Sequence, residues 1–479
     1  MKTKLGKHSV TAAEAALLCG GRIIREGKSA FPVTSFCTDS RDAAPGSLFL
    51  AIPGARTDGH LYIGQAAAAG ATAILCERDP GCDTGDAAVI AVESTVAAVG
   101  RFAAAYGKDS CAKRIAVTGS VGKTATKEMI YSTLSASGRR VFRSEGNLNT
   151  VIGMPLSFIS APAGTDFGIF EMGLELKGEI SAMSDICRPD TAAVTVLGSS
   201  HIGNIGSRKL LAAEKLGVAS GLAPDGCLLL PAGEPLFAEK IAEDDRVMTF
   251  SASGRADITA VNILSDGEKI RFDAFLPRFD RYIPGIRLPV PGLHNASNAL
   301  IAVAVGVKFG LDDEAVREGL ASYVPVKLRQ QILRIGGFTL LNDCYNASPE
   351  SMKAAFALLR DMALETEKKQ CRVRRFALLG DMYELGESAL ELHRETGRNY
   401  AASGGDFLIT VGRLAEAIAE GAAETMPADR IFVFPDIADL TAPAELLSGM
   451  LEEGDFLLVK ASRAVGAERI AEKLREIRG

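Results

Sequence analysis

The sequence predicts an α/β protein that is built from three domains. The chain has 479 residues, which is too many for one ordinary hydrophobic core, since domains of about 150 residues are typical. From residue 113 onward, short apolar runs alternate with segments of helical periodicity. This alternation is typical of parallel sheets that helices cover on both faces. We expect a small α/β domain at 1–108, a central domain at 109–324 and a Rossmann-like, doubly wound domain at 325–479.

Composition and charge exclude several classes of protein. Apolar residues make up 47% of the chain and charged residues 23%, which is typical of a globular protein in water. The net charge of −6 argues against nucleic-acid binding, which relies on Lys and Arg to neutralise phosphates. The nine cysteines form no C-x-x-C pair, so we expect neither disulfides nor a zinc site. No apolar stretch approaches the roughly 20 residues of a membrane span, and we expect a cytoplasmic protein.

The first region combines one capped helix with short strands. The lysines near the N-terminus precede an apolar run, as in a signal peptide, but Glu14 interrupts that run. Thr11 and Glu14 have the spacing of a capping box, and Gly20 stands where a helix stop is expected, so we predict a helix between Thr11 and Gly20. Apolar runs at 72–76 and 88–92 predict strands.

One loop of the first region carries residues that suit a nucleotide-sugar. Arg41 can bind a phosphate, and Asp39 or Ser40 can bind a sugar hydroxyl. An ordinary turn-rich loop with solvated charges explains the same residues, and this alternative stays open.

A strand, a glycine-rich turn and a helix follow one another in residues 114–131. In such a turn, backbone N–H groups and the helix N-terminus bind phosphate oxygens, a Lys neutralises the β and γ phosphates, and a Thr hydroxyl binds Mg²⁺. The full motif has a glycine where this chain has Val117, so the loop is a shortened form. We therefore predict a central P-loop ATPase-type parallel sheet that binds ATP and Mg²⁺ through Gly119, Ser120, Val121, Gly122, Lys123, Thr124 and Ala125.

Two further predicted strands of the central region lead to residues that can bind a metal ion. The run at 167–170 is followed by Glu171, and the run at 191–197 leads to His201. Ligands of open parallel sheets bind beyond the carboxyl ends of the strands, so we expect both side chains and the phosphate loop to face one crevice. There the two side chains would coordinate a metal ion beside the phosphates. The alternatives are a structural ion pair for Glu171 and a loop-capping role for His201.

Three other polar residues of the central region allow a structural or a functional interpretation. Lys215 lies on the apolar stripe of a helix, where a lysine usually extends its charge into solvent. Asn295 and Asn298 open an apolar helix, where they can read a base edge or, more usually, cap the helix.

The last region repeats the pattern of a parallel sheet. Polar residues follow each of its predicted strands, which indicates a second ligand surface at the carboxyl ends. The predicted strands are 338–341, 376–379, 407–410 and 456–459.

With these residues in hand, the chain resembles the ATP-dependent Mur ligases, and the resemblance extends over all three regions. The motifs that carry it occur in the order of the family. They are DSR at 39–41, PGSLF at 45–49, DGH at 58–60, TGSVGKTATKEM at 118–129, GNLNTVIGMPL at 146–156, EMG at 171–173, SHIGNIGS at 200–207, HNASNAL at 294–300, NDCYNASPESMKAA at 342–355, LLGDMYELGE at 378–387 and VKASRAVG at 459–466.

The resemblance implies a role for each candidate site residue. Lys215 matches the lysine that is carbamylated in the family, where the carbamate supports a second Mg²⁺; this replaces the structural interpretation of Lys215. Asn149 and Thr150 match substrate-binding positions. The remaining roles are phosphate binding by Lys123; metal binding by Thr124, Glu171 and His201; adenine contact by Asn295 and Asn298; closure on ATP by Arg329 and Asp343; and contact with uridine diphosphate by Asp39, Ser40 and Arg41.

The motifs of the last region are most similar to family members that add D-alanyl-D-alanine to UDP-N-acetylmuramoyl-tripeptide. The resemblance therefore implies an amide ligase of peptidoglycan precursor synthesis that works through an acyl phosphate. We expect a monomer whose partners are these two small molecules, with no nucleic acid and no membrane. The alternatives are another Mur-type or folylpolyglutamate-synthetase-like ligase that adds a single amino acid, and a P-loop NTPase switch.

Four positions depart from the commoner pattern of the family. Val121 stands where Asn is frequent, and Ala125 replaces a Thr. Thr150 replaces the second Asn of a pair, and Gly203 stands where many relatives have Glu. The departures leave the phosphate and metal residues in place.

Overall fold

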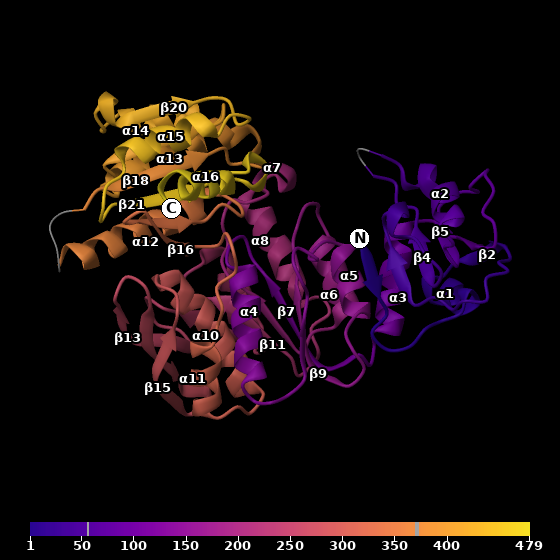
Figure 1. Cartoon of the computed structure of the whole chain (residues 1–479). Coiled ribbons are helices and arrows are strands. Elements are labelled where there is room, and N and C mark those ends of the chain that lie inside the picture. The colour runs from indigo at the N-terminus through magenta and orange to yellow at the C-terminus, as the bar shows by residue number, and fades with distance from the viewer. Residues whose placement is uncertain (55–56, 369–372) are drawn as a thin grey trace. The chain divides into compact units, whose positions relative to one another are not determined.

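The computed structural model describes residues 1–54, 57–368 and 373–479. The chain forms two compact units (Figure 1). Unit 1 comprises residues 1–118, 138–194 and 214–229, and unit 2 comprises residues 119–137, 195–213 and 230–479. Among the helices of the described residues, none combines the length and the apolar character that a bilayer-spanning helix requires.

The first sheet lies in unit 1 and is mostly parallel. Four central strands pair in parallel, and short antiparallel strands form both edges. The predicted runs at 72–76 and 88–92 form two of the central strands. The order is β1 (Lys2–Lys4), β3 (Ser35–Cys37), β4 (Ser47–Leu50), β5 (Ala73–Cys76), β6 (Ala88–Ala91) and β2 (Arg22–Arg25), and the helices are α1 (Ala12–Cys19), α2 (Ile63–Ala68) and α3 (Thr95–Tyr106).

The caps of α1 confirm the predicted helix. The Thr11 hydroxyl accepts a hydrogen bond from the Glu14 backbone N–H, and the Glu14 carboxylate accepts one from the Thr11 backbone N–H. Gly20 ends the helix at φ 64°, a left-handed conformation that glycine adopts without steric cost.

A parallel sheet in unit 1 positions the ends of three predicted strands. Its register pairs Val117 with Glu171 and Thr118 with Val194, so the neighbouring strands end at one edge of the sheet. The third strand is shorter than predicted, because residues 195–197 continue beyond its ladder. The order is β11 (Cys227–Pro231), β10 (Thr191–Val194), β7 (Cys111–Thr118), β9 (Thr165–Glu171) and β8 (Val141–Arg143), with α5 (Gly153–Ile159) and α6 (Glu179–Cys187).

Unit 2 departs from the expected alternation of strand and helix. In residues 258–288 three successive strands pair antiparallel, because the connections between them are too short for a parallel crossover. Gly267 at φ 87° and Asp280 at φ 49° lie in these tight connections. The elements are α4 (Lys123–Ser135), α7 (Ile202–Ile205), α8 (Arg208–Leu216), α9 (Ala238–Glu243), β12 (Val247–Ser251), β13 (Ile258–Ser265), β14 (Ile270–Leu276), β15 (Arg281–Leu288), α10 (Leu293–Lys308) and α11 (Asp313–Ala321).

The C-terminal sheet confirms the doubly wound prediction. Its strands alternate buried side chains between two apolar clusters, one with α12, α13 and α14 and the other with α15 and α16. One edge strand, β16, is antiparallel and was not expected. The order is β16 (Gln331–Ile335), β17 (Phe338–Asn342), β21 (Phe456–Lys460), β18 (Arg375–Gly380), β19 (Phe407–Val411) and β20 (Ile431–Phe434), and the helices are α12 (Pro349–Glu367), α13 (Ala389–Ala402), α14 (Glu416–Ala423), α15 (Thr441–Met450) and α16 (Glu468–Arg478).

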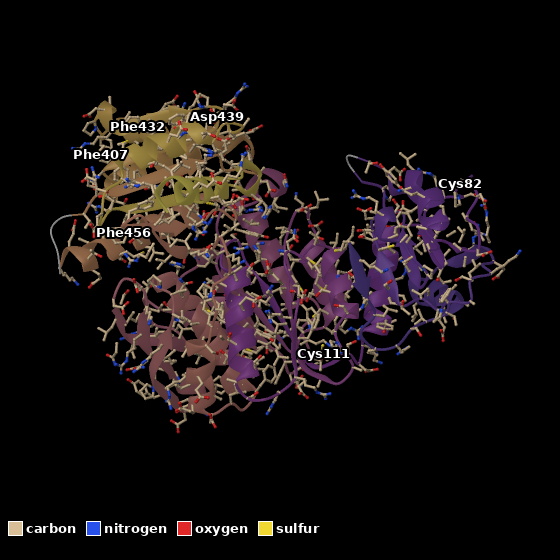
Figure 2. All side chains as sticks on the ribbon, in the orientation of Figure 1. Cys82, Cys111, Phe407, Phe432, Asp439 and Phe456 are labelled. Atoms are coloured by element: carbon tan, nitrogen blue, oxygen red, sulfur yellow. The ribbon has the colours of Figure 1, made fainter. Side chains whose placement is uncertain are left out.

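The cysteines of the described chain are free thiols. Cys82 is exposed, whereas the other described cysteines, Cys111 among them, are buried (Figure 2). Burial raises the pKa of the Cys111 thiol to about 12, which keeps it protonated and unreactive. Cys371 lies outside the described residues.

Candidate active site

The phosphate loop has the conformation that its sequence predicts. Residues 119–122 connect the end of β7 to α4, and Thr124 is buried in the first turn of that helix. The Lys123 ammonium donates hydrogen bonds to the carbonyl oxygens of Gly119, at 2.8 Å, and Ser120, at 3.3 Å. These contacts hold the charge of Lys123 over the turn, where phosphate oxygens bind in such loops.

Two glycines shape the loop because a side chain would not fit at either position. Gly119 has φ 143°, and an added Cβ would lie 2.0 Å from the Thr195 hydroxyl. Gly122 has φ 88°, and an added Cβ would lie 2.8 Å from Oδ1 of Asn298. The loop is therefore a cradle that a Cβ would fill, and it suits the close approach of a phosphate to the backbone.

The segment after β10 braces the loop from one side. The Thr195 hydroxyl donates to the carbonyl of Val121 at 2.5 Å, and the Ser120 hydroxyl accepts from the Gly198 N–H at 2.9 Å. The loop therefore keeps its shape through contacts of residues 195–198, of which 195–197 were predicted to belong to a strand. Val121 contributes only its carbonyl to this contact, which explains why the departure to Val is tolerated.

In unit 1, the side chains of Glu171 and Asn149 are hydrogen-bonded to each other. Glu171 is 2% exposed, and its Oε1 accepts a hydrogen bond from the Asn149 side-chain amide at 2.9 Å. The Glu171 backbone N–H donates to the Ser144 hydroxyl at 3.1 Å. The structure thus joins a predicted metal ligand to a predicted substrate-binding residue. Thr150 has a local role, because its hydroxyl accepts from the Gly153 N–H at the start of α5.

His201 contacts a carboxylate that sequence analysis did not select. Nδ1 of His201 lies 2.7 Å from Oε2 of Glu384, and His201 precedes α7 at φ 68°. The hydrogen bond from His201 lowers the pKa of the Glu384 carboxyl; burial opposes this, and the charges of His201 and Lys123 add to it. Because Nδ1 binds the carboxylate, Nε2 is the ring nitrogen that suits a metal ion.

A second carboxylate of the C-terminal region holds the same segment. Oε1 of Glu350 accepts hydrogen bonds from the Ser199 N–H, at 2.9 Å, and from the Ser199 hydroxyl, at 2.7 Å. Glu350 belongs to the first turn of α12 and Glu384 to the connection after β18. Both lie in motifs quoted for the family resemblance, but nothing in the linear sequence indicates which partner each carboxylate has.

Lys215 is fully buried in α8, with 0% exposure. The expectation that it extends its charge into solvent is wrong. The apolar stripe of a helix shows which side faces the interior but not how deeply a residue on that stripe is covered. A lysine is almost never fully buried without a specific reason, so its position is consistent with a functional role.

Asn295 and Asn298 do not cap their helix. Gly292 occupies the N-cap position of α10, and neither Asn side chain provides the capping bond. Asn298 packs against Gly122 of the phosphate loop instead. The Asn295 amide donates to the carbonyl of Pro291, at 2.7 Å, and to Oε1 of Gln330, at 3.0 Å.

Arg329 and Asp343 lie at the start of the C-terminal sheet. The Arg329 guanidinium stacks 4.0 Å from the ring centre of Tyr345. Oδ2 of Asp343 accepts a hydrogen bond from Lys460 Nζ at 2.5 Å, and Lys460 is 2% exposed. The signal for Lys460 was its place directly after a predicted strand.

In the loop that is predicted to contact uridine diphosphate, Asp39 and Arg41 bind each other. Asp39 accepts three hydrogen bonds from the Arg41 guanidinium, at 2.9, 3.1 and 2.5 Å, and caps the turn through the Arg41 N–H. These bonds lower the pKa of the Asp39 carboxyl. The Ser40 hydroxyl is buried and donates to Oε1 of Gln65. Arg41 remains 80% exposed, so it is the residue of this loop that a phosphate can reach.

Three family models match successive parts of the chain. The Mur ligase family catalytic domain matches residues 32–107, the Mur ligase middle domain matches 117–306, and the Mur ligase glutamate ligase domain matches 328–463.

Individual relatives match the chain over almost its full length. UDP-N-acetylmuramoyl-tripeptide--D-alanyl-D-alanine ligase of Bacillus subtilis is 34% identical over 440 residues, which cover 92% of each chain. The structure of MurF from Acinetobacter baumannii has a TM-score of 0.85 at 28% identity and covers 98% of this chain and 99% of that chain. MurF ligase from Thermotoga maritima, solved in complex with ADP, has a TM-score of 0.79 at 27% identity, with 92% and 97% covered. The chain therefore belongs to the Mur ligase family.

Proposed function

We propose that the protein is an ATP-dependent ligase that joins D-alanyl-D-alanine to the terminal carboxylate of UDP-N-acetylmuramoyl-tripeptide. The observation that carries this proposal is the identity of 34% over 92% of the chain to a relative of that name. The same similarity favours a dipeptide-adding ligase over one that adds a single amino acid. It also favours a ligase over a P-loop switch. The three domains would occupy 1–108, 109–324 and 325–479.

ATP fits the phosphate loop on the geometry of this chain. The turn between Gly119 and Gly122 leaves no room for a Cβ, and it places Lys123 beside the backbone that receives phosphate oxygens. Asn298 packs on the loop, so a nucleotide whose phosphates occupy the loop would direct its base toward the start of α10. Arg329 and Asp343 would contact the nucleotide from the C-terminal region.

Mg²⁺ would be held by few protein groups. Within the described residues, no cluster of three or more His, Cys, Asp or Glu is arranged to hold a metal ion. Mg²⁺ typically keeps several waters and binds phosphates with one or two ligands from the protein. Bound Mg²⁺ would offset charge on the transferring phosphoryl group. Thr124 would bind one Mg²⁺, Glu171 and His201 would share in metal binding, and a carbamylated Lys215 would support a second Mg²⁺.

The reaction would proceed in two steps. A carboxylate oxygen of the tripeptide attacks the γ-phosphorus of ATP, and the bond to the β–γ bridging oxygen breaks, which gives an acyl phosphate and ADP. The amine of D-alanyl-D-alanine then attacks the acyl carbon, phosphate leaves, and the nitrogen loses a proton. Lys123 stabilises charge on the transferring phosphoryl group, and the backbone of the loop orients it.

The tripeptide substrate would contact residues of unit 1. Arg41 is exposed enough to bind the diphosphate, and that contact would compete with its pair to Asp39. Asn149, held against Glu171, and Thr150 would contact the same substrate. Ser40 would act through its backbone, because its hydroxyl is already bound to Gln65. We propose a monomer with no other partner.

Phosphate release from ATP tests the proposal directly. The purified chain is assayed with Mg²⁺, UDP-N-acetylmuramoyl-tripeptide and D-alanyl-D-alanine, and each component is omitted in turn. We expect release only when all are present. Release that needs a single amino acid in place of the dipeptide would assign the chain to a sister activity, and release that needs neither acceptor would indicate an NTPase switch.

A further inference from the structure

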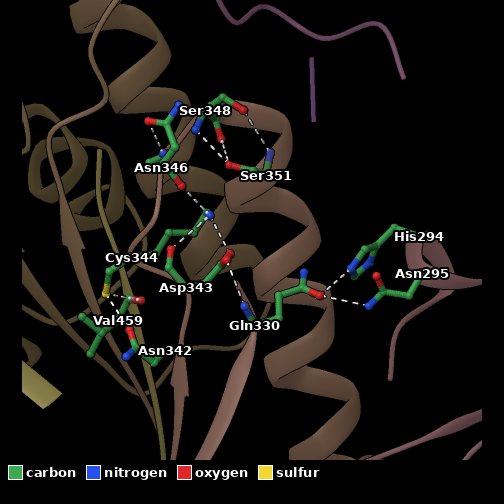
Figure 3. A network of polar contacts seen from close by, with 12 residues as sticks. His294, Asn295, Gln330, Asn342, Asp343, Cys344, Asn346, Ser348, Ser351 and Val459 are labelled. Atoms are coloured by element: carbon green, nitrogen blue, oxygen red, sulfur yellow. Dashed lines mark hydrogen bonds and ion pairs between the residues drawn. The ribbon is translucent and has the colours of Figure 1, made fainter. Parts of the chain in front are cut away.

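Gln330 is bound to two side chains at the start of α10. Its Oε1 accepts hydrogen bonds from His294 Nε2, at 2.8 Å, and from Asn295 Nδ2, at 3.0 Å (Figure 3). Burial lowers the pKa of His294, so its imidazole is neutral and carries its proton on Nε2, toward Gln330. One amide oxygen therefore receives both donors.

These contacts fix the orientation of the Asn295 amide. Its Nδ2 donates to the Pro291 carbonyl and to Gln330 Oε1, which engages both of its protons. A flipped amide would turn Oδ1 toward these two acceptor oxygens, which is electrostatically unfavourable. Asn295 is 5% exposed, so the flip would not be compensated by water. Oδ1 is consequently presented as a fixed acceptor.

A fixed acceptor distinguishes the two purine bases. Adenine carries an amino group at C6, which donates hydrogen bonds, whereas guanine carries an oxygen there, which accepts them. Oδ1 of Asn295 can therefore pair with the adenine amino group and repels the guanine oxygen. Reversal of the amide would reverse this preference, so the group that holds the amide matters as much as Asn295.

Gln330 is itself held from the C-terminal sheet. Its backbone N–H donates to Oδ1 of Asp343 at 3.1 Å (Figure 3), and Oδ2 of Asp343 binds the buried Lys460. The carbonyl of Leu328 accepts from the Tyr345 N–H at 3.0 Å. Leu328 and Gln330 have φ angles of 62° and 51°, in the left-handed region that non-glycine residues adopt only where contacts impose it. The connection formed by residues 328–330 is thus held at one end by Tyr345 and at the other by Asp343.

We propose that Gln330 is a positioning residue that fixes the Asn295 amide and thereby sets the preference for adenine over guanine nucleotides. This inference rests on the proposed function, which places the base at the start of α10. The Lys460 and Asp343 pair fixes the backbone of Gln330, so selectivity for the base is coupled to the packing of the C-terminal sheet.

Nucleotide binding by the full chain tests this role without the other substrates. Dissociation constants for ATP and GTP are measured by calorimetry in Mg²⁺ for the wild type, Gln330→Met and Gln330→Glu. Methionine is similar in length but accepts no comparable hydrogen bond, whereas glutamate keeps an acceptor oxygen. We expect Gln330→Met to weaken ATP binding about tenfold and to change GTP binding less than about twofold. Gln330→Glu should keep a preference close to that of the wild type.

A matched control variant and a double-mutant cycle distinguish a positioning role of Gln330 from a general loss of structure. Gln331→Met alters the neighbouring glutamine, which is outside the network, and should leave both constants unchanged. Because Gln330 acts through Asn295, the loss of preference in Asn295→Ala should not increase when Gln330→Met is added. Should Gln330→Met fail to fold, Gln330→Asn, which is one methylene shorter, should show the same loss.

Each result bears on the inference in a defined way. An ATP-to-GTP ratio in Gln330→Met equal to that of the wild type would overturn it, and so would equal weakening of both nucleotides. If the wild type binds ATP selectively and Gln330→Met retains the selectivity, the inference fails and the proposed ligase stands. If the wild type binds no ATP, the proposed function fails with it.

Discussion

The side chain of Lys123 shows how one charge is positioned by its own loop. Its ammonium binds two carbonyl oxygens of the turn, and the turn is shaped by glycines that tolerate no Cβ. The position of the charge therefore follows from local sequence, which is why the motif alone predicted it. Lys215 is the opposite case, since its burial depends on packing around α8 that a helical pattern does not contain.

Removal of the Lys123 charge should abolish most of the activity. Lys123→Ala is expected to lower kcat by about 10²–10³-fold or more, because it removes a donor aimed at developing negative charge. The side chain is half-buried, so the melting temperature is measured in parallel to separate loss of the charge from loss of structure. Lys177→Ala, at an exposed lysine, is the control. Phosphate release by Lys123→Ala at a near-normal rate would remove the loop from the mechanism.

Replacement of Lys215 tests the carbamate. Lys215→Ala should be inactive, and short carboxylates such as acetate or propionate should restore part of the activity by occupying the place of the carbamate. The melting temperature, measured in parallel, separates this effect from loss of packing around a fully buried residue. A folded variant that no carboxylate or bicarbonate restores would count against the carbamate.

At the scale of elements, α7 and the connection after β18 meet through their backbones. An added Cβ at Gly203 would lie 2.6 Å from the Gly386 backbone nitrogen, and the Gly203 N–H lies 3.4 Å from the Glu384 carbonyl oxygen. This contact leaves no room for a side chain at Gly203, the position where the family resemblance implied Glu. The same contact places Glu384 beside His201.

A methyl group at position 203 should separate these elements. Gly203→Ala is expected to destabilise the protein by about 1–3 kcal/mol through overpacking and to lower activity by displacing Glu384 from His201. Gly449→Ala is the matched control, because Gly449 lies in α15 and an added Cβ would contact nothing within 4 Å. Thermal unfolding followed by circular dichroism, together with phosphate release, measures both effects. Equal behaviour of the two variants would contradict this account of the contact.

The helix α13 contributes a buried histidine whose charge state affects stability. His393 Nε2 accepts from the Met382 N–H at 2.9 Å, and Nδ1 donates to the Ala389 carbonyl at 2.6 Å, so the ring is neutral. Burial lowers the pKa of His393 from its usual value of 6.5. At a pH between the pKa of His393 in the folded chain and its pKa in the unfolded chain, the unfolded chain binds more protons than the folded chain. The stabilisation is therefore complete above pH 6.5 and is lost as the pH falls below it.

Urea unfolding between pH 5 and 7.5 tests whether the stability of the protein falls as the pH decreases. The midpoint for the wild type should fall as the pH decreases below about 6.5, and His393→Asn should be less stable overall but less dependent on pH in this range. His294, whose pKa is also lowered, should leave part of the dependence in the variant. A variant with the same pH dependence as the wild type would exclude His393 as a cause.

At the scale of the whole molecule, the sequence predicted the sheets well and the long-range contacts poorly. Apolar runs such as 376–379 and 456–459 identify strands because periodicity is a local property. The antiparallel strands β13, β14 and β15 differ from the expected alternation, since short connections rather than apolar pattern decide their pairing. The domain bounds and the common crevice of the phosphate loop, Glu171 and His201 stay predictions.

The site residues likewise divide into those that a local motif identifies and those that only long-range contacts reveal. Lys123 and Thr124 were identified by a contiguous motif. Glu384, Glu350, Gln330 and Lys460 were not selected, because each acts through a partner that lies between 35 and 183 positions away in the chain. No local pattern specifies such pairs, and only the folded chain brings them together.

The measurement that tests the central claim most directly follows one oxygen atom. UDP-N-acetylmuramoyl-tripeptide labelled with ¹⁸O in its terminal carboxylate is incubated with the protein, ATP, Mg²⁺ and D-alanyl-D-alanine, and the released phosphate is analysed by mass spectrometry. An acyl phosphate transfers one labelled oxygen to phosphate for each amide formed, and this is the result we predict. Amide formation with unlabelled phosphate would contradict the mechanism, and phosphate release without amide would contradict the assignment as a ligase.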